Sequence, residues 1–112
     1  MRFISLFTHV DQGLPPTKDE MAKMGKLVEE GTKAGWLIAT EGVHGGSHGF
    51  RVQSTGGKIE VTDGPFAEAK EVIGGYALIR ASSKEEVIEL TRKFLEVAGD
   101  GTCEIHQLFE MA

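Results

Sequence analysis

The segment VTDGPFAEAKEVIGGYALI, residues 61 to 79, lies between two apolar runs and decides how the rest of the chain is arranged. A strand is expected to end at Asp63, and Gly64-Pro65 then forms a turn in which proline fixes the backbone φ angle. Gly74-Gly75 opens the next expected strand, at residues 73–81. Glycines inside a strand indicate a bulge or a close backbone approach. We therefore predict a tightly packed corner between two strands.

A β-hairpin is predicted immediately before this corner. Strands are expected at residues 50–55 and 58–62, and Gly56-Gly57 between them is a strong signal for a two-residue turn because glycine accepts positive φ angles. In that register one face of the hairpin is largely apolar and carries Phe50, Val52, Ser54, Ile59, Val61 and Asp63. The Asp63 carboxylate is thus expected on the apolar side, opposite Phe50.

Helix caps and hydrophobic periodicity mark the remaining elements. Residues 2–10 alternate, with Phe3, Ser5, Phe7 and His9 on one face and apolar side chains also on the other, which is typical of a central strand. Thr17 and Ser83 each precede a glutamate by three residues, so each is expected to begin a helix through a capping box. Further strands are expected at 36–40 and 102–109. The inward positions of the second helix are expected to be Val87, Ile88, Thr91, Phe94, Leu95 and Ala98.

Without the hairpin, the predicted order is β-α-β-β-α-β, the pattern of a ferredoxin-like sheet with both helices on one face. The fold class is therefore α+β, ferredoxin-like with an inserted β-hairpin, in a single domain over residues 1–112. Both faces of the strands are apolar, yet one chain offers no third layer. We expect a second copy to cover the other face, giving a homodimer through the sheet.

Composition narrows the classes of partner. The net charge is −5 and no segment concentrates lysine or arginine, which argues against nucleic acid as a partner. No run is long enough for a transmembrane helix, so no membrane association is expected. The single cysteine, Cys103, excludes an internal disulfide and fits a reducing compartment. We predict a cytoplasmic protein.

The segment Asp63-Gly64-Pro65-Phe66, the Ala-Glu-Ala-Lys-Glu after it and Gly-Gly-Tyr together resemble the YCII-related, DGPF-domain family, and the similarity spans almost the whole chain. The ending EIHQLFE, residues 104–110, is also similar to that family, with His106 where the family usually has arginine. The resemblance implies a dimeric α+β barrel. The same superfamily includes muconolactone isomerases, and one YCII-related branch has a proposed His–Asp pair whose histidine lies on the first helix. Residues 17–34 here contain no histidine.

Asp63 and His9 are the candidate catalytic residues. Partial burial at the edge of a cleft would tune the Asp63 carboxylate as a base or acceptor, whereas an Asx turn would use it only to bind nearby backbone N–H groups. His9, at the end of the first strand, is a candidate to replace the missing helical histidine as proton carrier. The alternative for His9 is a purely structural role.

Ligand contacts are assigned to Phe66, Glu68, Tyr76 and Glu41, and each has a plainer alternative. Phe66 would instead anchor the loop, Glu68 would face solvent, and Tyr76 would serve packing. His44 and His48, near Glu41, have side chains that can bind Zn²⁺, but the surrounding glycines favour a solvated loop, so no metal is predicted.

Two functions fit these residues. The first is a small-ligand binding or accessory protein, with a cleft near the Asp-Gly-Pro-Phe loop. The second is a cofactor-independent enzyme of isomerase or lyase type, in which Asp63 and His9 move protons. Neither function requires a cofactor, and none is expected.

Overall fold

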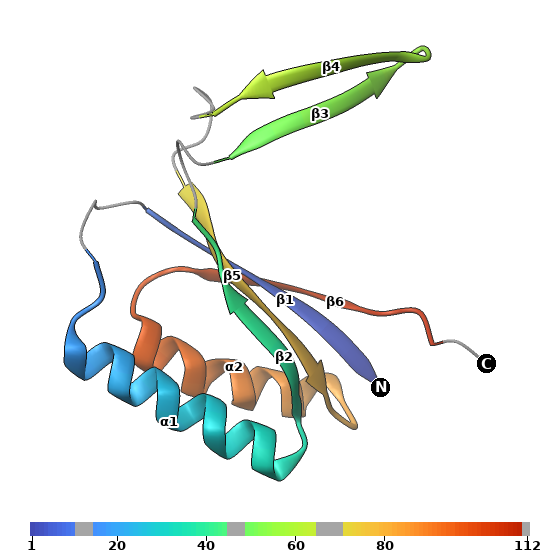
Figure 1. The fold of residues 1–112 in the computed structure, drawn as a ribbon. Coiled ribbons are helices and arrows are strands. Elements are labelled where there is room, and N and C mark those ends of the chain that lie inside the picture. The colour runs from blue at the N-terminus through green and yellow to red at the C-terminus, as the bar shows by residue number, and fades with distance from the viewer. Residues whose placement is uncertain (11–14, 45–48, 65–70, 111–112) are drawn as a thin grey trace.

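The computed structural model describes residues 1–10, 15–44, 49–64 and 71–110 of the chain. Two helices and six strands follow the predicted order (Figure 1). They are β1 (Arg2–Val10), α1 (Lys18–Ala34), β2 (Leu37–Gly42), β3 (Phe50–Thr55), β4 (Lys58–Asp63), β5 (Glu71–Arg80), α2 (Lys84–Ala98) and β6 (Thr102–Gln107). No helix in these ranges is long and apolar enough to cross a lipid bilayer.

Four strands form one antiparallel sheet in the order β2-β5-β1-β6, and β3 and β4 form a separate hairpin. The predicted central position of β1 is confirmed, because it pairs with both β5 and β6. Helices α1 and α2 lie on the same side of the sheet (Figure 1). This is the ferredoxin-like α+β arrangement that the sequence predicts, with the hairpin inserted between β2 and β5.

Several strand ends differ from the predicted ones, because cross-strand pairing, rather than local propensity, sets them. Strand β2 continues to Gly42, two residues past its predicted end, since Glu41 and Gly42 pair with Tyr76 and Gly75 of β5. Strand β5 begins at Glu71 instead of residue 73, because Glu71 pairs with Val10. Strand β6 ends at Gln107, two residues earlier than expected.

Both predicted helix caps are confirmed. The Thr17 hydroxyl accepts a hydrogen bond from the Glu20 backbone N–H at 3.1 Å, and Ser83 does the same for Glu86. Gly35 ends α1 with a φ angle of 86°, in the left-handed region that glycine adopts without a Cβ clash.

The core lies between the sheet and the helices, and it is small. Its buried apolar residues are Phe3, Leu37, Ile79, Ala81 and Val87. The prediction that Ile88 points into the core is wrong, since 44% of this residue is exposed. Val87, at 2% exposure, lies at the centre of the inward face of α2. The next residue in a helix is rotated by about 100°, which turns Ile88 toward solvent.

The chain exposes much more surface than a folded monomer of its mass. Its accessible area is 8464 Å², whereas a monomer of 12.1 kDa is expected to expose about 6,000 Å². The radius of gyration is 15.9 Å, against about 13 Å for a compact domain of this length. The hairpin contributes to this excess, since Phe50, Val52, Ile59 and Val61 are all more than half exposed.

The hairpin stands clear of the sheet (Figure 1). Its predicted register is confirmed: Phe50 pairs with Asp63, and Val52 pairs with Val61. The apolar face of the hairpin therefore exists as expected. Every residue of β3 and β4 is nevertheless exposed, so the described part of the chain leaves this face uncovered.

Two glycines of α1 make a matched pair for testing the packing of this helix. A Cβ on Gly31 would lie 2.7 Å from Cζ2 of the Trp36 indole, whereas a Cβ on Gly25 would meet nothing within 4 Å. We expect Gly25→Ala to stabilise the protein by about 1 kcal/mol through helix propensity. Gly31→Ala is expected to destabilise it, because the indole is rigid and packs on the core. Urea denaturation of both variants checks this difference, and stabilisation by Gly31→Ala would contradict the packing described here.

Candidate functional site

A cavity of about 990 Å³ lies between the helices and the sheet. Its helical walls are mostly apolar and include Met21, Met24, Leu27 and Val28 from α1 and Leu90, Thr91, Phe94 and Val97 from α2. Its sheet wall includes Phe7, His9, Thr40, Gly74, Gly75 and Ala77. Binding sites for small molecules typically have volumes of about 300–1,000 Å³, an apolar lining and a few polar groups. The cavity has the size and lining of such a site.

The glycine pair of β5 forms part of the sheet wall. Gly74 is the extra residue of a bulge, because Phe7 pairs with Gly75 and the next residue of β1, Thr8, pairs with Ile73. A Cβ on Gly74 would lie 2.8 Å from the His9 ring, and one on Gly75 would lie 2.7 Å from the Glu41 carbonyl oxygen. The predicted bulge and close backbone approach are both confirmed. With no side chain at these two positions, the His9 ring and the Glu41 backbone can pack directly against β5.

A buried hydroxyl lies in the wall of the cavity on α2. Thr91 lines the cavity, and its Oγ1 is buried without a hydrogen-bond partner among the described residues. A buried polar group left unpaired costs about 1–3 kcal/mol. The neighbouring hydroxyl of Thr40 is engaged, because it donates to the Tyr76 carbonyl oxygen at 2.8 Å. Oγ1 is closed to solvent, so a polar group placed in the cavity would reach it after the Thr91 side chain rotates about χ1.

His9 lies in the sheet wall with one ring nitrogen engaged. Its ring stacks on Phe7, with centroids 5.4 Å apart and planes 14° apart. His9 Nδ1 lies 3.1 Å from the Val10 carbonyl oxygen, which can only accept, so Nδ1 carries the hydrogen. In the neutral imidazole Nε2 is then an acceptor, and this edge of the ring lies over Gly74. His9 can accept a proton or a hydrogen bond at Nε2.

The structure does not bring Asp63 to this cavity. Asp63 ends β4 on the exposed hairpin, and no hydrogen bond joins it to His9 in the described part of the chain. The N–H of Gly64 donates to the Gly49 carbonyl oxygen at 2.8 Å. Residue 65, whose N–H would close an Asx turn on Asp63, is a proline and has no N–H. The pairing of Asp63 with His9 stays a prediction.

Tyr76 and Glu41 face each other across β5 and β2, and both border the cavity beside the glycine pair. Gly75 pairs with Phe7, which lies with His9 on the helical side of the sheet. Side chains alternate along a strand, so those of Tyr76 and its partner Glu41 point to the opposite face. Their backbone therefore contributes to the cavity wall, and their side chains belong to the open face of the sheet.

Three of the predicted site residues, Phe66, Glu68 and His48, lie outside the described residues. His44 is exposed after β2. Within the described ranges, no group of three histidine, cysteine, aspartate or glutamate side chains is placed to hold a metal ion.

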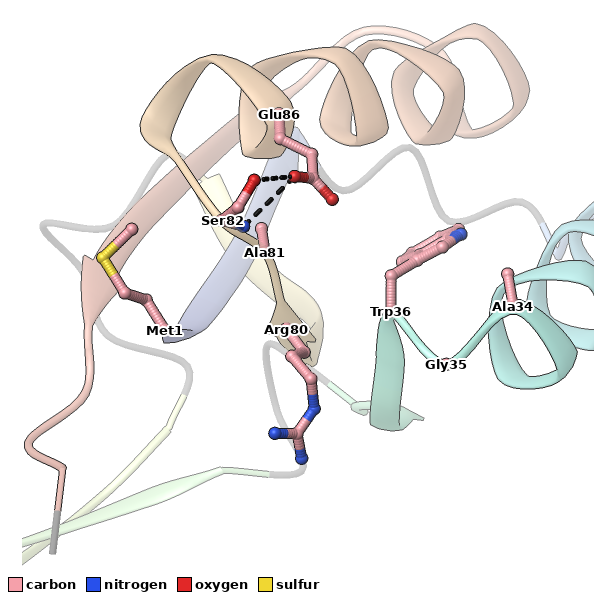
Figure 2. Close-up of a pocket in the computed structure, with 8 residues that line it drawn as sticks. All are labelled: Met1, Ala34, Gly35, Trp36, Arg80, Ala81, Ser82 and Glu86. Atoms are coloured by element: carbon pink, nitrogen blue, oxygen red, sulfur yellow. Dashed lines mark hydrogen bonds between the residues drawn. The ribbon is translucent and has the colours of Figure 1, made fainter. Parts of the chain in front are cut away.

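A second hollow of about 490 Å³ lies at the opposite end of the sheet and involves Trp36, Arg80 and Glu86 (Figure 2). Figure 2 shows Glu86 turned toward Ser82 and Arg80 pointing away from both. The Glu86 carboxylate accepts hydrogen bonds from the Ser82 hydroxyl and backbone N–H, and the hydroxyl bond lowers the pKa of the Glu86 carboxyl. The Glu86 carboxylate therefore holds the start of α2 in place, and we assign this hollow a structural role.

Sequence reasoning placed Thr91 among the inward positions of α2 but did not select it as a site residue. The available signal was a hydroxyl on a helical stripe that otherwise carries apolar residues such as Val87 and Phe94. On α1, Met21 and Met24 also line the cavity.

Comparison with protein families gives one match that bears on identity. The model of the YCII-related domain matches residues 1–112. A comparison with curated proteins found no match. Because the family match covers the chain from end to end, this protein belongs to the YCII-related domain family.

Proposed function

We propose that this protein binds a small, mainly apolar molecule with one polar group in the cavity between α1, α2 and the sheet. The observation that supports this proposal best is the buried, unpaired hydroxyl of Thr91 in an otherwise largely apolar wall. The ligand's polar group would bind Thr91, and its apolar part would contact Met21, Met24 and Phe94. The cleft is thus assigned to the helical side of the sheet, away from Asp63.

Packing energetics favour a ligand over an alternative in which the cavity only reflects a loose core. Protein interiors are close-packed, and residual cavities reduce stability in proportion to their volume. A wall that combines flexible methionines with glycines adapts to ligands of different shape. An apolar ligand would add the dispersion contacts that the lining side chains lack.

We also propose that the working unit is a homodimer in which two sheets pack through their open faces. The chain exposes about 2,400 Å² more than a monomer of its mass, which is in the range that one subunit buries in an obligate dimer. Ile4, Leu6, Tyr76 and Leu78 lie on that open face by strand alternation. Each cavity lies on the helical side of its sheet, so sheet pairing leaves both cavities accessible.

Octan-1-ol serves as a probe of the cavity, because it has an apolar chain and one hydroxyl. We expect it to change the fluorescence of Trp36, the only tryptophan of the chain, which lines the cavity. Thr91→Val should weaken octanol binding by about three- to tenfold, the equivalent of one net hydrogen bond. The same variant should stabilise the ligand-free protein by about 1 kcal/mol, because it removes an unpaired buried hydroxyl.

Thr62→Val is the matched control, because Thr62 lies on the exposed hairpin. It should leave octanol affinity unchanged. Fluorescence titration measures binding, and thermal unfolding measures stability. Equal octanol affinity in wild type and Thr91→Val would contradict the assignment of the ligand's polar group to Thr91, and no response of Trp36 would contradict the cavity as the binding site.

His9 favours a second function, proton transfer of the isomerase type without a cofactor. Its Nε2 is an acceptor at the cavity wall, so it is placed to take a proton from a bound carbon acid. Octan-2-one in D₂O tests this chemistry: His9 would remove a proton beside the carbonyl and return a deuteron to the same carbon. We expect deuterium incorporation above the buffer rate with wild type and at the buffer rate with His9→Gln.

Thr62→Val again provides the control, and it should exchange like wild type. Mass spectrometry of the recovered ketone gives the readout. Exchange that persists in His9→Gln would exclude His9 as the base. If wild type binds the ketone without exchanging it, the function is binding alone.

A further inference from the structure

The β3–β4 hairpin has one apolar face that no described residue outside the hairpin covers. Phe50, Val52, Ile59 and Val61 share this face and are 68%, 57%, 63% and 64% exposed, respectively. The opposite face is polar, with Gln53 paired to Glu60. An isolated two-stranded hairpin is at best marginally stable in water. A regular hairpin with such a sharp division between its faces indicates that its apolar side packs on another surface.

A second apolar group is exposed at the other end of the molecule. Phe109 follows β6 and is 97% exposed. Its backbone is nevertheless held in place, because Nη2 of Arg2 donates to the Phe109 carbonyl oxygen at 3.3 Å and the Leu108 N–H donates to the Arg2 carbonyl oxygen at 2.8 Å. A phenylalanine that is fixed at its backbone and exposed at its ring is suited to receive a partner.

The open face of the sheet has opposite charges at its two ends. Arg2 and Arg80 are paired across β1 and β5 at one end, and there Arg2 also forms an ion pair with Glu110, with Nε and Oε2 3.4 Å apart. Glu71 lies at the other end, on the face that carries Thr8, since the Thr8 hydroxyl donates to its carboxylate at 3.2 Å. The carboxylate of Glu41 also lies toward that end, opposite Tyr76. Because Glu110 offsets Arg2, Arg80 supplies the net positive charge at one end of the strands, and Glu71 and Glu41 make the other end negative.

This polarity selects one of two ways to pair two sheets face to face. A two-fold axis along the strands would place the Arg2–Arg80 pair against its own copy, which like-charge repulsion disfavours. An axis across the strands turns one sheet end to end, so that the arginines of one subunit lie over Glu71 and Glu41 of the other. Complementary charges favour the second arrangement.

The end-to-end arrangement also brings the hairpin to the exposed phenylalanine. The hairpin follows β2 and precedes β5, so it extends from the end of the sheet that carries Glu71. Figure 1 shows that the C-terminal segment after β6 lies at the far end of the strands. In the turned dimer, the hairpin of one subunit therefore lies next to the partner's segment that carries Phe109.

We propose that the β3–β4 hairpin is an arm that clasps a second copy of this chain, with Val52 and Val61 packed against Phe109 of the partner subunit. The proposal rests on the sheet-to-sheet dimer proposed above, and it adds the orientation of the two subunits and a second contact. Each arm covers the end of the other subunit, so the contact occurs twice in a symmetric dimer.

The directly paired Val52 and Val61 offer a sharp test, with the directly paired Gln53 and Glu60 as the matched control. Threonine retains β-propensity at all four positions. Sedimentation equilibrium should give a dissociation constant at least tenfold higher for the double variant V52T/V61T than for wild type, because two symmetric apolar contacts are weakened. The double variant Q53T/E60T should dissociate like wild type.

Phe109→Ser should weaken the dimer as V52T/V61T does. Phe109→Ser combined with V52T/V61T should raise the dissociation constant little beyond the value for either change alone, because all of these substitutions remove the same contact. Fully additive effects would show that the arm and Phe109 do not touch, and an unchanged dissociation constant in V52T/V61T would overturn the arm.

A monomeric wild type would instead contradict the sheet dimer. Binding of wild type to phosphatidylcholine vesicles that is lost in V52T/V61T would assign the arm to a membrane and overturn the proposal.

Discussion

The sheet of this protein is covered by two helices on one face and by no other described element on the other, and this asymmetry governs most of the structure. A strand such as β1 carries apolar side chains on both faces, with Phe3 buried against the helices and Ile4 directed to the open side. Two layers can bury only one of these faces. The excess exposed area, the amphipathic hairpin and the exposed Phe109 all follow if the second face is completed by another subunit.

The covered face has its own irregularity, a bulge in the sheet wall of the cavity. Gly74 and Gly75 remove side chains from β5 at the point where His9 and the Glu41 backbone approach most closely. The helices span this region with flexible methionines and with Thr91, whose hydroxyl is buried and unpaired among the described residues. The two glycines thus allow β5 to approach His9 and β2 closely, and they form part of the sheet wall of the proposed ligand site.

The sequence predicts well those features that depend on neighbouring residues. The caps at Thr17 and Ser83 and the hairpin register around Gly56-Gly57 are local, and all are confirmed. The position of β1 in the sheet follows from its two apolar faces. By contrast, the end of β2 and the exposure of Ile88 depend on tertiary pairing and packing, and these predictions failed.

The residues of the candidate site also separate into those that local sequence predicts and those that depend on tertiary packing. Alternation alone places His9 on the helical face, where the cavity lies. Asp63 was predicted from a strong local turn, but the distance of the hairpin from the cavity depends on how distant segments pack, which the turn does not encode. Thr91 was not selected because an inward threonine usually bonds to a carbonyl of the preceding turn. Only the tertiary structure places its hydroxyl beside a cavity without such a bond.

The most direct measurement of the central claim, that one chain needs a second copy to complete its core, is the dependence of unfolding on protein concentration. Urea unfolding of wild type would be followed by circular dichroism at concentrations spanning about three orders of magnitude. Mass action requires the midpoint of an obligate dimer to rise with concentration, since only the folded state is associated. A midpoint that rises across the series is the expected result. A midpoint independent of concentration, together with a mass of 12.1 kDa in sedimentation, would contradict the claim.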